Sequence, residues 1–301
     1  MSLSIDGVEI VDTFAEAFPM TAARAILTAD TPRWAATAAR VMTGYGTSVI
    51  GCDAEAGVER MMDEAETPDG RPGVSVLLFG FSRDALEKAM INRVGQCVMT
   101  CPTSACYNGL ALTDKSIKVG GALRYFGDGW QISKRLPDGR RFWRIPVMDG
   151  EFTCEDLFGT VKGVAGGNLI IAGVDGPTTL AAAEAAVEAI GRIGGGMILP
   201  FPGGIARSGS KVGSKYKGLR ASSNAAFSPT LRGLVTSELP DAAGAAYEIV
   251  IDGLDLDAVG RATAVGVRAA CLPGILRVTS GNYGGKLGPH HLRLHDVLAK
   301  F

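Results

Sequence analysis

The 301-residue chain has almost no surplus charge of either sign: 30 Lys and Arg residues stand against 31 Asp and Glu residues, for a net charge of −1. A domain that binds nucleic acid needs a basic surface for the phosphates, so this balance argues against DNA or RNA as the main partner. Aromatic residues make up only 7% of the chain. No strand has the aromatic pattern with which sheet proteins stack RNA bases, and we expect no nucleic-acid partner.

Long apolar runs are also missing. The apolar stretch 74–81 is interrupted by Ser75 and Gly80 and is far too short to cross a bilayer. The first residues show neither the basic nor the apolar segment of a signal peptide. We therefore expect a cytoplasmic protein without a membrane partner.

Histidine is scarce, and the three residues lie near the end of the chain: His290, His291 and His295. They fit an alternating strand more simply than a set of ligands. The six cysteines are scattered, and the closely spaced Cys97, Cys101 and Cys106 match no zinc-ligand spacing. We therefore expect buried thiols in a reducing compartment, no metal and no bound cofactor.

The chain is rich in apolar and small residues instead: 47% of residues are hydrophobic and 41 are glycine. Such a composition is sufficient for a sizeable core with many tight turns. These residues are arranged in two similar halves. Each half has an apolar strand, a helix start at Pro32 or Pro177, and an Ala-rich helix with helical apolar spacing. A second strand, a glycine turn and a second helix start follow at 78–86 and 251–259.

This order of elements, β-α-β followed by β-α-β, is typical of the ferredoxin-like fold. We predict an α+β fold of two ferredoxin-like lobes from an internal duplication, with antiparallel sheets covered by helices. The junction is expected near 146–148, after a polar hairpin. The N-terminal lobe would then contain residues 1–147 and the C-terminal lobe residues 148–301.

The second half contains an insertion. Gly46 and Gly80 are 34 residues apart, whereas the matching Gly191 and Gly253 are 62 apart, so about 28 residues are added within 196–246. The added segment is rich in glycine, serine and lysine, which can hold anionic or carbonyl-bearing groups. It does not match a P-loop. The alternative is a flexible, solvated surface loop.

One carboxylate also distinguishes the second half. Glu248 lies in the apolar strand 245–251, at the position where the first half has Ser75. Burial would raise the pKa of this carboxyl and suit it to acid–base chemistry near neutral pH. Alternation along the strand equally allows a glutamate on a solvent-facing side of the sheet. The spacing alone leaves both interpretations open.

Motifs spread over the chain are more specific than any single feature above. They lie at 11–18 (VDTFAEAF), 66–74 (ETPDGRPGV), 93–100 (RVGQCVMT), 163–168 (GVAGGN), 200–205 (PFPGGI), 210–215 (SKVGSK), 247–251 (YEIVI) and 284–288 (GGKLG). Together, from about residue 3 to the C-terminus, the chain resembles the formylmethanofuran:tetrahydromethanopterin formyltransferase family.

The resemblance implies a homo-oligomeric enzyme with two ferredoxin-like lobes and substrates in a cleft between them. It implies transfer of a formyl group between the amine of methanofuran and N5 of tetrahydromethanopterin, with no metal or prosthetic group; both carriers are substrates. It also implies that the glutamate of the Tyr-Glu-Ile-Val-Ile strand, Glu248 here, is the catalytic acid and base.

The near-neutral composition departs from the strongly acidic members of methanogens and is more similar to the bacterial, methylotrophic branch. That likeness implies the formaldehyde-oxidation direction and a role as one component of a formyltransferase/hydrolase complex that releases formate. The expected partners are further copies of the chain and other subunits of such a complex. The alternative is a scaffold subunit with weak or no catalysis, against which the retention of Glu248, Lys211 and Lys215 argues.

With these substrates, the polar residues of the insertion and of the glycine-rich stretch 281–288 become candidate ligands. The oxyanion of a tetrahedral intermediate needs fixed donors, and one carboxyl can accept and return the proton. Lysine ammonium groups are expected to hold the acidic tails of the carriers. The predicted substrate-binding residues are Ser208, Ser210, Lys211, Ser214, Lys215, Asn224 and Lys286.

Overall fold

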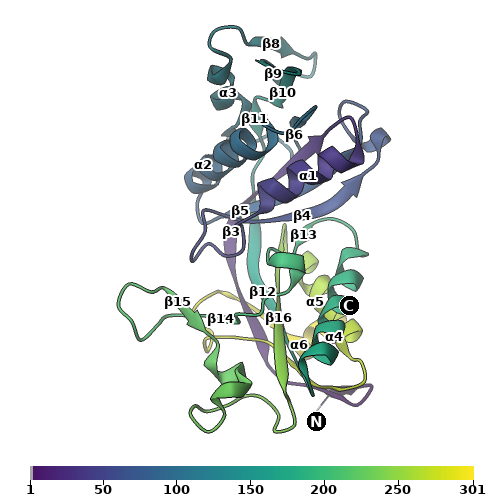
Figure 1. Ribbon diagram of the computed structural model, residues 1–301, viewed down its shortest axis with the longest axis vertical. Coiled ribbons are helices and arrows are strands. Elements are labelled where there is room, and N and C mark those ends of the chain that lie inside the picture. The colour runs from purple at the N-terminus through teal and green to yellow at the C-terminus, as the bar shows by residue number, and fades with distance from the viewer. Residues whose placement is uncertain (1–2) are drawn as a thin grey trace. The chain divides into compact units, whose positions relative to one another are not determined.

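The computed structural model describes residues 3–301 and has a mixed α and β architecture with two compact units (Figure 1). One unit contains residues 3–19 and 164–301, and the other contains residues 20–163. Strands β3 (Phe14–Thr28) and β12 (Val161–Gly173) contribute to both units. These units do not coincide with lobes divided at residue 147. Residues 3–19 pack with the C-terminal part of the chain, and residues 148–163 pack with the N-terminal part.

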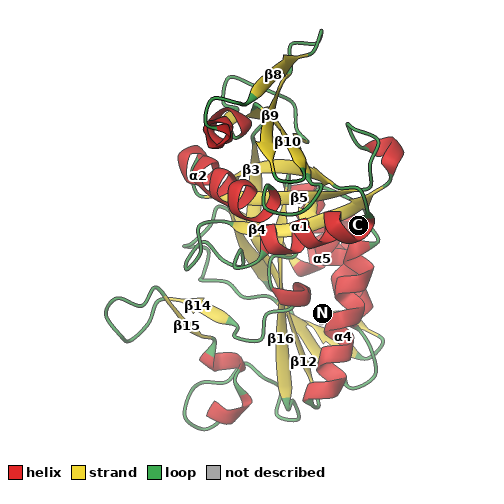
Figure 2. Ribbon diagram, turned by 45° about the horizontal axis from the view of Figure 1, so that its top comes forward, coloured by secondary structure: helices red, strands yellow, loops and turns green. Residues whose placement is uncertain are grey.

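The unit of residues 20–163 has a central antiparallel sheet in the order β4-β5-β3-β6. Helices α1 (Pro32–Thr43) and α2 (Arg83–Arg93) cover one face of it (Figure 2). Strand β10 extends the sheet, parallel to β6 and antiparallel to β9, and β9 pairs with β8. The remaining bounds are β4 (Glu55–Met62), β5 (Gly73–Gly80), β6 (Ala105–Asn108), β7 (Ile117–Lys118), α3 (Gly120–Leu123), β8 (Ile132–Arg135), β9 (Arg141–Val147), β10 (Gly150–Glu155) and β11 (Leu157–Phe158).

The unit that contains residues 164–301 has a second antiparallel sheet, in the order β13-β16-β12-β17. Helices α4 (Gly176–Gly191) and α5 (Leu256–Ala270) pack against it and against each other. Strand β2 extends this sheet, parallel to β17 and antiparallel to β1. The remaining bounds are β1 (Leu3–Ile5), β2 (Val8–Ile10), β13 (Met197–Ile198), β14 (Ser210–Val212), β15 (Ala221–Ser223), β16 (Ala245–Gly253), β17 (Ile275–Thr279), β18 (His290–Arg293) and α6 (Leu294–Lys300).

The helix starts follow the predicted signals. Thr31 caps α1 by accepting the N–H of Trp34, and Asp175 caps α4 by accepting the N–H of Thr178. A proline stands in the first turn of both helices, where its missing N–H costs nothing. Within residues 3–301, no helix is both long and apolar enough to span a membrane.

Alternation along β16 assigns its side chains to the two faces of the sheet. Ile249 and Ile251 pack into the core beneath α4 and α5, together with Leu169 and Ile171 of β12. Glu248 therefore lies on the opposite face. That face is not open to solvent along its whole length, because Ser208, Asn224 and Phe227 of the inserted segment line a pocket there together with Glu248. The backbone of Ala206 pairs with the backbone of Glu248 along the edge of β16, through hydrogen bonds of 2.7 and 3.0 Å.

A buried arginine stabilises the unit of residues 20–163. The side chain of Arg93 is 8% exposed and donates to Met42 O at 2.5 Å, in the last turn of α1, and to Gly44 O at 2.8 Å, at its C-cap. It also forms an ion pair with Asp53 at 2.6 Å. The guanidinium thus satisfies carbonyl groups that the end of α1 leaves without intrahelical donors.

Replacement of this arginine tests its structural role. We expect Arg93→Met to lower the free energy of unfolding by about 3 kcal/mol, because two carbonyl groups and one carboxylate lose their donors together. The measurement is chemical denaturation monitored by circular dichroism. Lys88→Met, on an exposed position of the same helix, is the matched control. An equal loss in both variants would refute the role of Arg93.

Candidate active site

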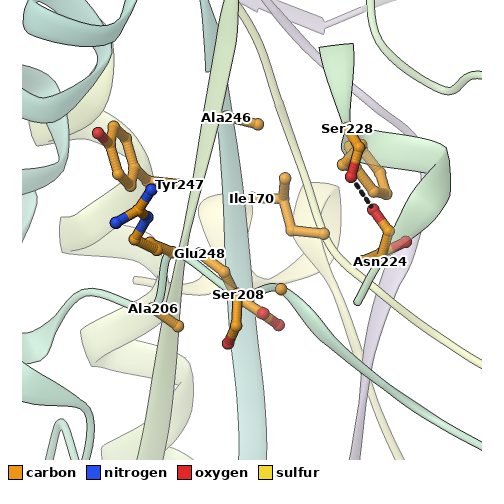
Figure 3. Close-up of a pocket in the computed structure, with 11 residues that line it drawn as sticks. Ile170, Ala206, Ser208, Asn224, Ser228, Ala246, Tyr247 and Glu248 are labelled. Atoms are coloured by element: carbon orange, nitrogen blue, oxygen red, sulfur yellow. Dashed lines mark hydrogen bonds between the residues drawn. The ribbon is translucent and has the colours of Figure 1, made fainter. Parts of the chain in front are cut away.

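Glu248 lies in the middle of β16, opposite Ile170 of β12, beside a small pocket of about 40 Å³ (Figure 3). Ala206, Ser208 and Asn224 of the inserted segment line the same pocket. In Figure 3, Ile170 lies between Glu248 and the hydrogen-bonded pair Asn224 and Ser228. The pocket thus combines a strand carboxyl group, polar groups of the insertion and an apolar wall.

The electrostatic environment of Glu248 favours a protonatable carboxyl group. Burial raises the pKa of Glu248 above its ordinary value of 4.5, and the hydrogen bond from Asn168 partly opposes this rise. Asn168 Nδ2 donates to Glu248 Oε1 at 2.8 Å. A carboxyl group with a raised pKa can both accept and donate a proton near neutral pH.

Asn168 ends the motif 163–168, but it was not among the predicted site residues. It lies in β12, on the same face of the sheet as Glu248 and diagonal to it in the strand register. Gly281 N–H donates to its Oδ1 at 3.1 Å, and Ser280 Oγ donates to its backbone O at 2.8 Å. The signal in the sequence is an amide inside an otherwise apolar strand, the same kind of exception that identified Glu248.

A second carboxylate, Glu16 of β3, holds the glycine-rich segment 281–288. Glu16 is only 4% exposed. Its carboxylate accepts hydrogen bonds from the backbone N–H groups of Tyr283 at 2.6 Å, Gly285 at 3.1 Å and Gly288 at 2.8 Å, and also from that of Leu287. Burial alone would raise the pKa of Glu16, but these donors together lower it below 4.5. This carboxylate was also missed, because its donors lie more than 260 residues away in the chain.

The segment 281–288 is connected to the insertion. The hydroxyl of Tyr283 accepts the backbone N–H of Val212 at 2.9 Å. Burial raises the pKa of Tyr283, with further contributions from the negative charges of Glu248 and Glu16, while the Val212 N–H opposes the rise. Tyr283 therefore lies close enough to both Glu248 and Glu16 to feel their charges, although the two glutamates are far apart in the sequence.

The predicted substrate-binding residues fall into two groups. Ser208 and Asn224 line the pocket with Glu248. Lys211 lies in β14 and pairs with Ser222 of β15, and Ser214 and Lys215 lie in the loop between these two strands. Both lysine side chains are exposed. Lys286 is exposed in segment 281–288. The side chain of Ser210 lies outside the part that the structure describes.

The pocket lining also contains residues that were not predicted to bind substrate: Arg207, Gly209, Phe227, Ala246 and Tyr247. Arg207 is exposed, so its guanidinium is accessible to an anionic ligand at the rim of the pocket. The tyrosine was within the recognised strand motif, but alternation directs its ring to the opposite face from Glu248 (Figure 3).

The histidines do not gather into a ligand set. His290 and His291 lie in the predicted strand, β18, and His291 stacks near Phe14 with ring centroids 4.6 Å apart. His295 contacts the backbone O of Ile10 at 2.9 Å. Within residues 3–301, no group of three or more His, Cys, Asp or Glu side chains is arranged to hold a metal ion, and the six cysteines are free thiols.

Comparison with known proteins identifies the family. Residues 3–147 match the family described as formylmethanofuran-tetrahydromethanopterin formyltransferase, and residues 150–297 match its proximal lobe. The formylmethanofuran–tetrahydromethanopterin formyltransferase of Methylococcus capsulatus is 54% identical, with 98% of this chain and 99% of that protein covered. One component of the formyltransferase/hydrolase complex of Methylorubrum extorquens is 53% identical, with 99% of this chain and 98% of that protein covered.

Solved structures agree with these sequence matches. The formyltransferase/hydrolase complex of Methylorubrum extorquens with methylofuran contains a chain that superposes with a TM-score of 0.94 at 52% identity, covering 99% of each chain. The formyltransferase of Methanosarcina barkeri superposes with a TM-score of 0.92 at 47% identity, covering 98% of this chain and all of that one. The chain therefore belongs to the formylmethanofuran–tetrahydromethanopterin formyltransferase family.

Proposed function

We propose that this protein is an N-formyltransferase that moves a formyl group between N5 of tetrahydromethanopterin and the amine of methanofuran or an analogue. Family membership over nearly the whole chain supports the reaction. The observation that carries it in the structure is the Glu248 carboxyl group of raised pKa beside a pocket of about 40 Å³. A water molecule needs roughly 10–15 Å³ of such volume, so the pocket has room for a one-carbon group.

Glu248 is the acid and base of this proposal. The amine of one carrier attacks the formyl carbon on the other, a C–N bond forms, and the Glu248 carboxylate accepts the proton that the attacking nitrogen loses. The resulting tetrahedral intermediate carries an oxyanion, for which the Ser208 hydroxyl at the pocket is a candidate donor. The bond to the outgoing nitrogen then breaks, and Glu248 returns the proton to that nitrogen. One residue therefore serves both directions.

The proposed physiological direction is formaldehyde oxidation, in which the methanofuran-type carrier receives the formyl group. The Methylorubrum relative belongs to a complex that also contains a hydrolase, which fits consumption of the formylated carrier after transfer. By this likeness, we place the protein in the cytoplasm, as a homo-oligomer with other subunits of such a complex. The two carriers are substrates, and no bound cofactor enters the proposed steps.

The fold proposal is a duplication of one ferredoxin-like unit, with evolutionary lobes at residues 1–147 and 148–301. Two observations support it. The sheet orders β4-β5-β3-β6 and β13-β16-β12-β17 correspond element for element, each with two helices between the matching strands. The strands that extend the sheets also correspond: β2 pairs parallel with β17, and β10 pairs parallel with β6. The halves thus exchange equivalent hairpins, which explains why the compact units begin at residue 20 and residue 164.

The substrate-binding proposal places Lys211, Lys215 and Lys286 at the acidic tails of the carriers, and Ser208 and Asn224, which line the pocket with Glu248, nearer the reacting groups. Ser210 and Ser214 are kept as proposed ligands of the carriers. We expect Lys211→Ala and Lys215→Ala each to raise the KM of at least one carrier about fivefold with little change in kcat, because a lost ion pair weakens binding without altering chemistry. Steady-state kinetics with both carriers provides the measurement. The KM of Lys134→Ala, another exposed lysine, should stay at the original value. Unchanged KM values for both carriers would refute the assignment of these lysines.

The experiment that tests the function is a direct assay of the purified protein. Formyl transfer is measured in both directions between the two carriers, alone and with the partner subunits. Transfer at a rate comparable to that of the relatives is the expected result. Absence of transfer, even with the partner subunits present, would overturn the enzymatic proposal and favour a scaffold subunit.

A further inference from the structure

A single amide side chain fixes the carboxyl group of Glu248 from the neighbouring strand. Asn168 Nδ2 donates to Glu248 Oε1 at 2.8 Å, between diagonal neighbours on one face of the sheet. The far end of the amide is fixed as well, because Gly281 N–H donates to Asn168 Oδ1 at 3.1 Å. A backbone N–H can only donate, so this contact determines that the NH₂ end of Asn168 faces Glu248.

The other sheet shows what a charged partner does at the corresponding place. Arg24 of β3 occupies the position that matches Asn168, two residues before Ile26, which pairs with Ser75 as Ile170 pairs with Glu248. There, Arg24 binds Glu59 at 2.7 and 2.5 Å, and Ser75 Oγ donates to Glu59 at 2.5 Å. On that sheet, the corresponding position is therefore occupied by a charged residue that forms an ion pair.

The neutral amide of Asn168 affects the Glu248 carboxyl group differently from the way a charged arginine would. An arginine at position 168 would hold Glu248 ionised and oppose its protonation, whereas an amide orients the carboxyl group without adding charge. The other ionisable groups on the side of Glu248 are Arg207 of the pocket lining and Tyr283 of segment 281–288, whereas the ring of Tyr247 packs on the opposite face of the sheet. Neither side chain donates a hydrogen bond to Glu248 among residues 3–301. The side-chain hydrogen bond that the Glu248 carboxyl group receives comes from Asn168.

We propose that Asn168 is a positioning residue of the formyl-transfer reaction, which holds the Glu248 carboxyl group in its reacting orientation and favours its ionised form. The inference rests on the proposed acid–base role of Glu248. Its chemical basis is the anchored amide: Gly281 N–H fixes one end, and the other end has the correct donor for a carboxylate. The amide acts through Glu248 and takes no proton itself.

Two variants separate hydrogen bonding from packing. Asn168→Ala removes the amide, and Asn168→Asp keeps its shape and its acceptor for Gly281 N–H but replaces the donor to Glu248 with an oxygen. We expect both variants to lower kcat about 10- to 100-fold, with the KM of each carrier within about threefold of the original value. The acidic limb of the kcat/KM profile should move to higher pH in both, and further in Asn168→Asp, because a second carboxylate also disfavours ionisation of Glu248.

A structural control distinguishes this effect from general damage to the site. Ser280→Ala removes the bond from Ser280 Oγ to the backbone O of Asn168 but leaves the amide in place, so the acidic limb should keep its position. Infrared titration of the Glu248 carboxyl, taken as a difference from the Glu248→Gln variant, reports the same shift without an activity assay. Circular dichroism and thermal melting establish that the variants are folded.

The outcomes separate this inference from the proposed function. If Glu248→Gln abolishes transfer while both Asn168 variants retain kcat within about twofold and keep the original acidic limb, the positioning role is refuted and the acid–base role stands. If the Glu248 carboxyl titrates at the same pH in the original protein and in Asn168→Ala, the inference is likewise overturned. If Glu248→Gln is itself fully active, the acid–base proposal fails, and the positioning role fails with it.

Discussion

Glu248→Gln is expected to lower kcat for formyl transfer by about 10³-fold, with smaller changes in the KM of either carrier. Gln keeps the size of the side chain but can neither accept nor return the proton that moves between the two nitrogens. General acid–base catalysis contributes about 10²- to 10⁴-fold in enzymes, which sets the expected range. Steady-state kinetics in both directions provides the measurement, and both directions should be affected because the same carboxyl serves each.

The pH dependence follows from the direction of the Glu248 pKa shift. Burial raises this pKa above 4.5, so the carboxylate needed to accept the proton from the attacking amine is lost as pH falls through the raised value. The acidic limb of kcat/KM should therefore lie above pH 4.5 and disappear in Glu248→Gln. Glu238→Gln, in the same inserted segment but not in the pocket lining, should behave as the original protein. A near-original rate in Glu248→Gln would remove this residue from the mechanism.

Glu16→Gln is expected to lower the free energy of unfolding by about 3 kcal/mol and to loosen segment 281–288. The Glu16 carboxylate accepts four backbone N–H groups of that segment in a position that is only 4% exposed. The amide of Gln would turn an NH₂ group towards some of these donors and leave them unsatisfied. Denaturant unfolding measures the loss of stability. Hydrogen exchange at Tyr283, Gly285 and Gly288 measures the local loosening.

The same carboxylate predicts an acid-sensitive segment. Burial alone would raise the pKa of Glu16, but its four N–H donors lower it below 4.5. A group whose pKa is depressed on folding stabilises the protein above its unfolded-state pKa, and this contribution is lost as pH falls through the folded value. Protection of segment 281–288 should therefore persist at pH 5 and above and decline below about 4.5 in the original protein.

The control for this prediction is Glu9→Gln, another β-strand carboxylate of the same unit. Glu9 forms an ion pair with Arg277 at 2.8 Å, but its side chain is 45% exposed, so its loss should cost less than about 1 kcal/mol. Equal exchange rates in Glu16→Gln and in the original protein would show that the segment is held by other contacts.

Local features of the fold were predictable because they depend on neighbouring residues. Prolines after capping residues placed the starts of α1 and α4, as Thr31 and Asp175 show. Comparison of the two similar halves isolated both the insertion and Glu248, because a recurring sequence pattern makes the positions that depart from it visible. The pairing of β2 with β17 could not be predicted, since the two strands lie near opposite ends of the chain and no local pattern encodes such a partner.

The sequence by itself determined the starts of α1 and α4, the family and the residue on which the chemistry is proposed to depend. Only the tertiary structure decided whether Glu248 is exposed or enclosed. Alternation left both possibilities open, and the fold leaves Glu248 half-buried, because Ser208, Asn224 and Phe227 of the inserted segment line a pocket on the face where Glu248 lies. The tertiary structure also brought Asn168, Gly281 and Glu16 to the site, because hydrogen bonds between segments more than 80 residues apart depend on how the strands pack and not on the spacing of residues along the chain.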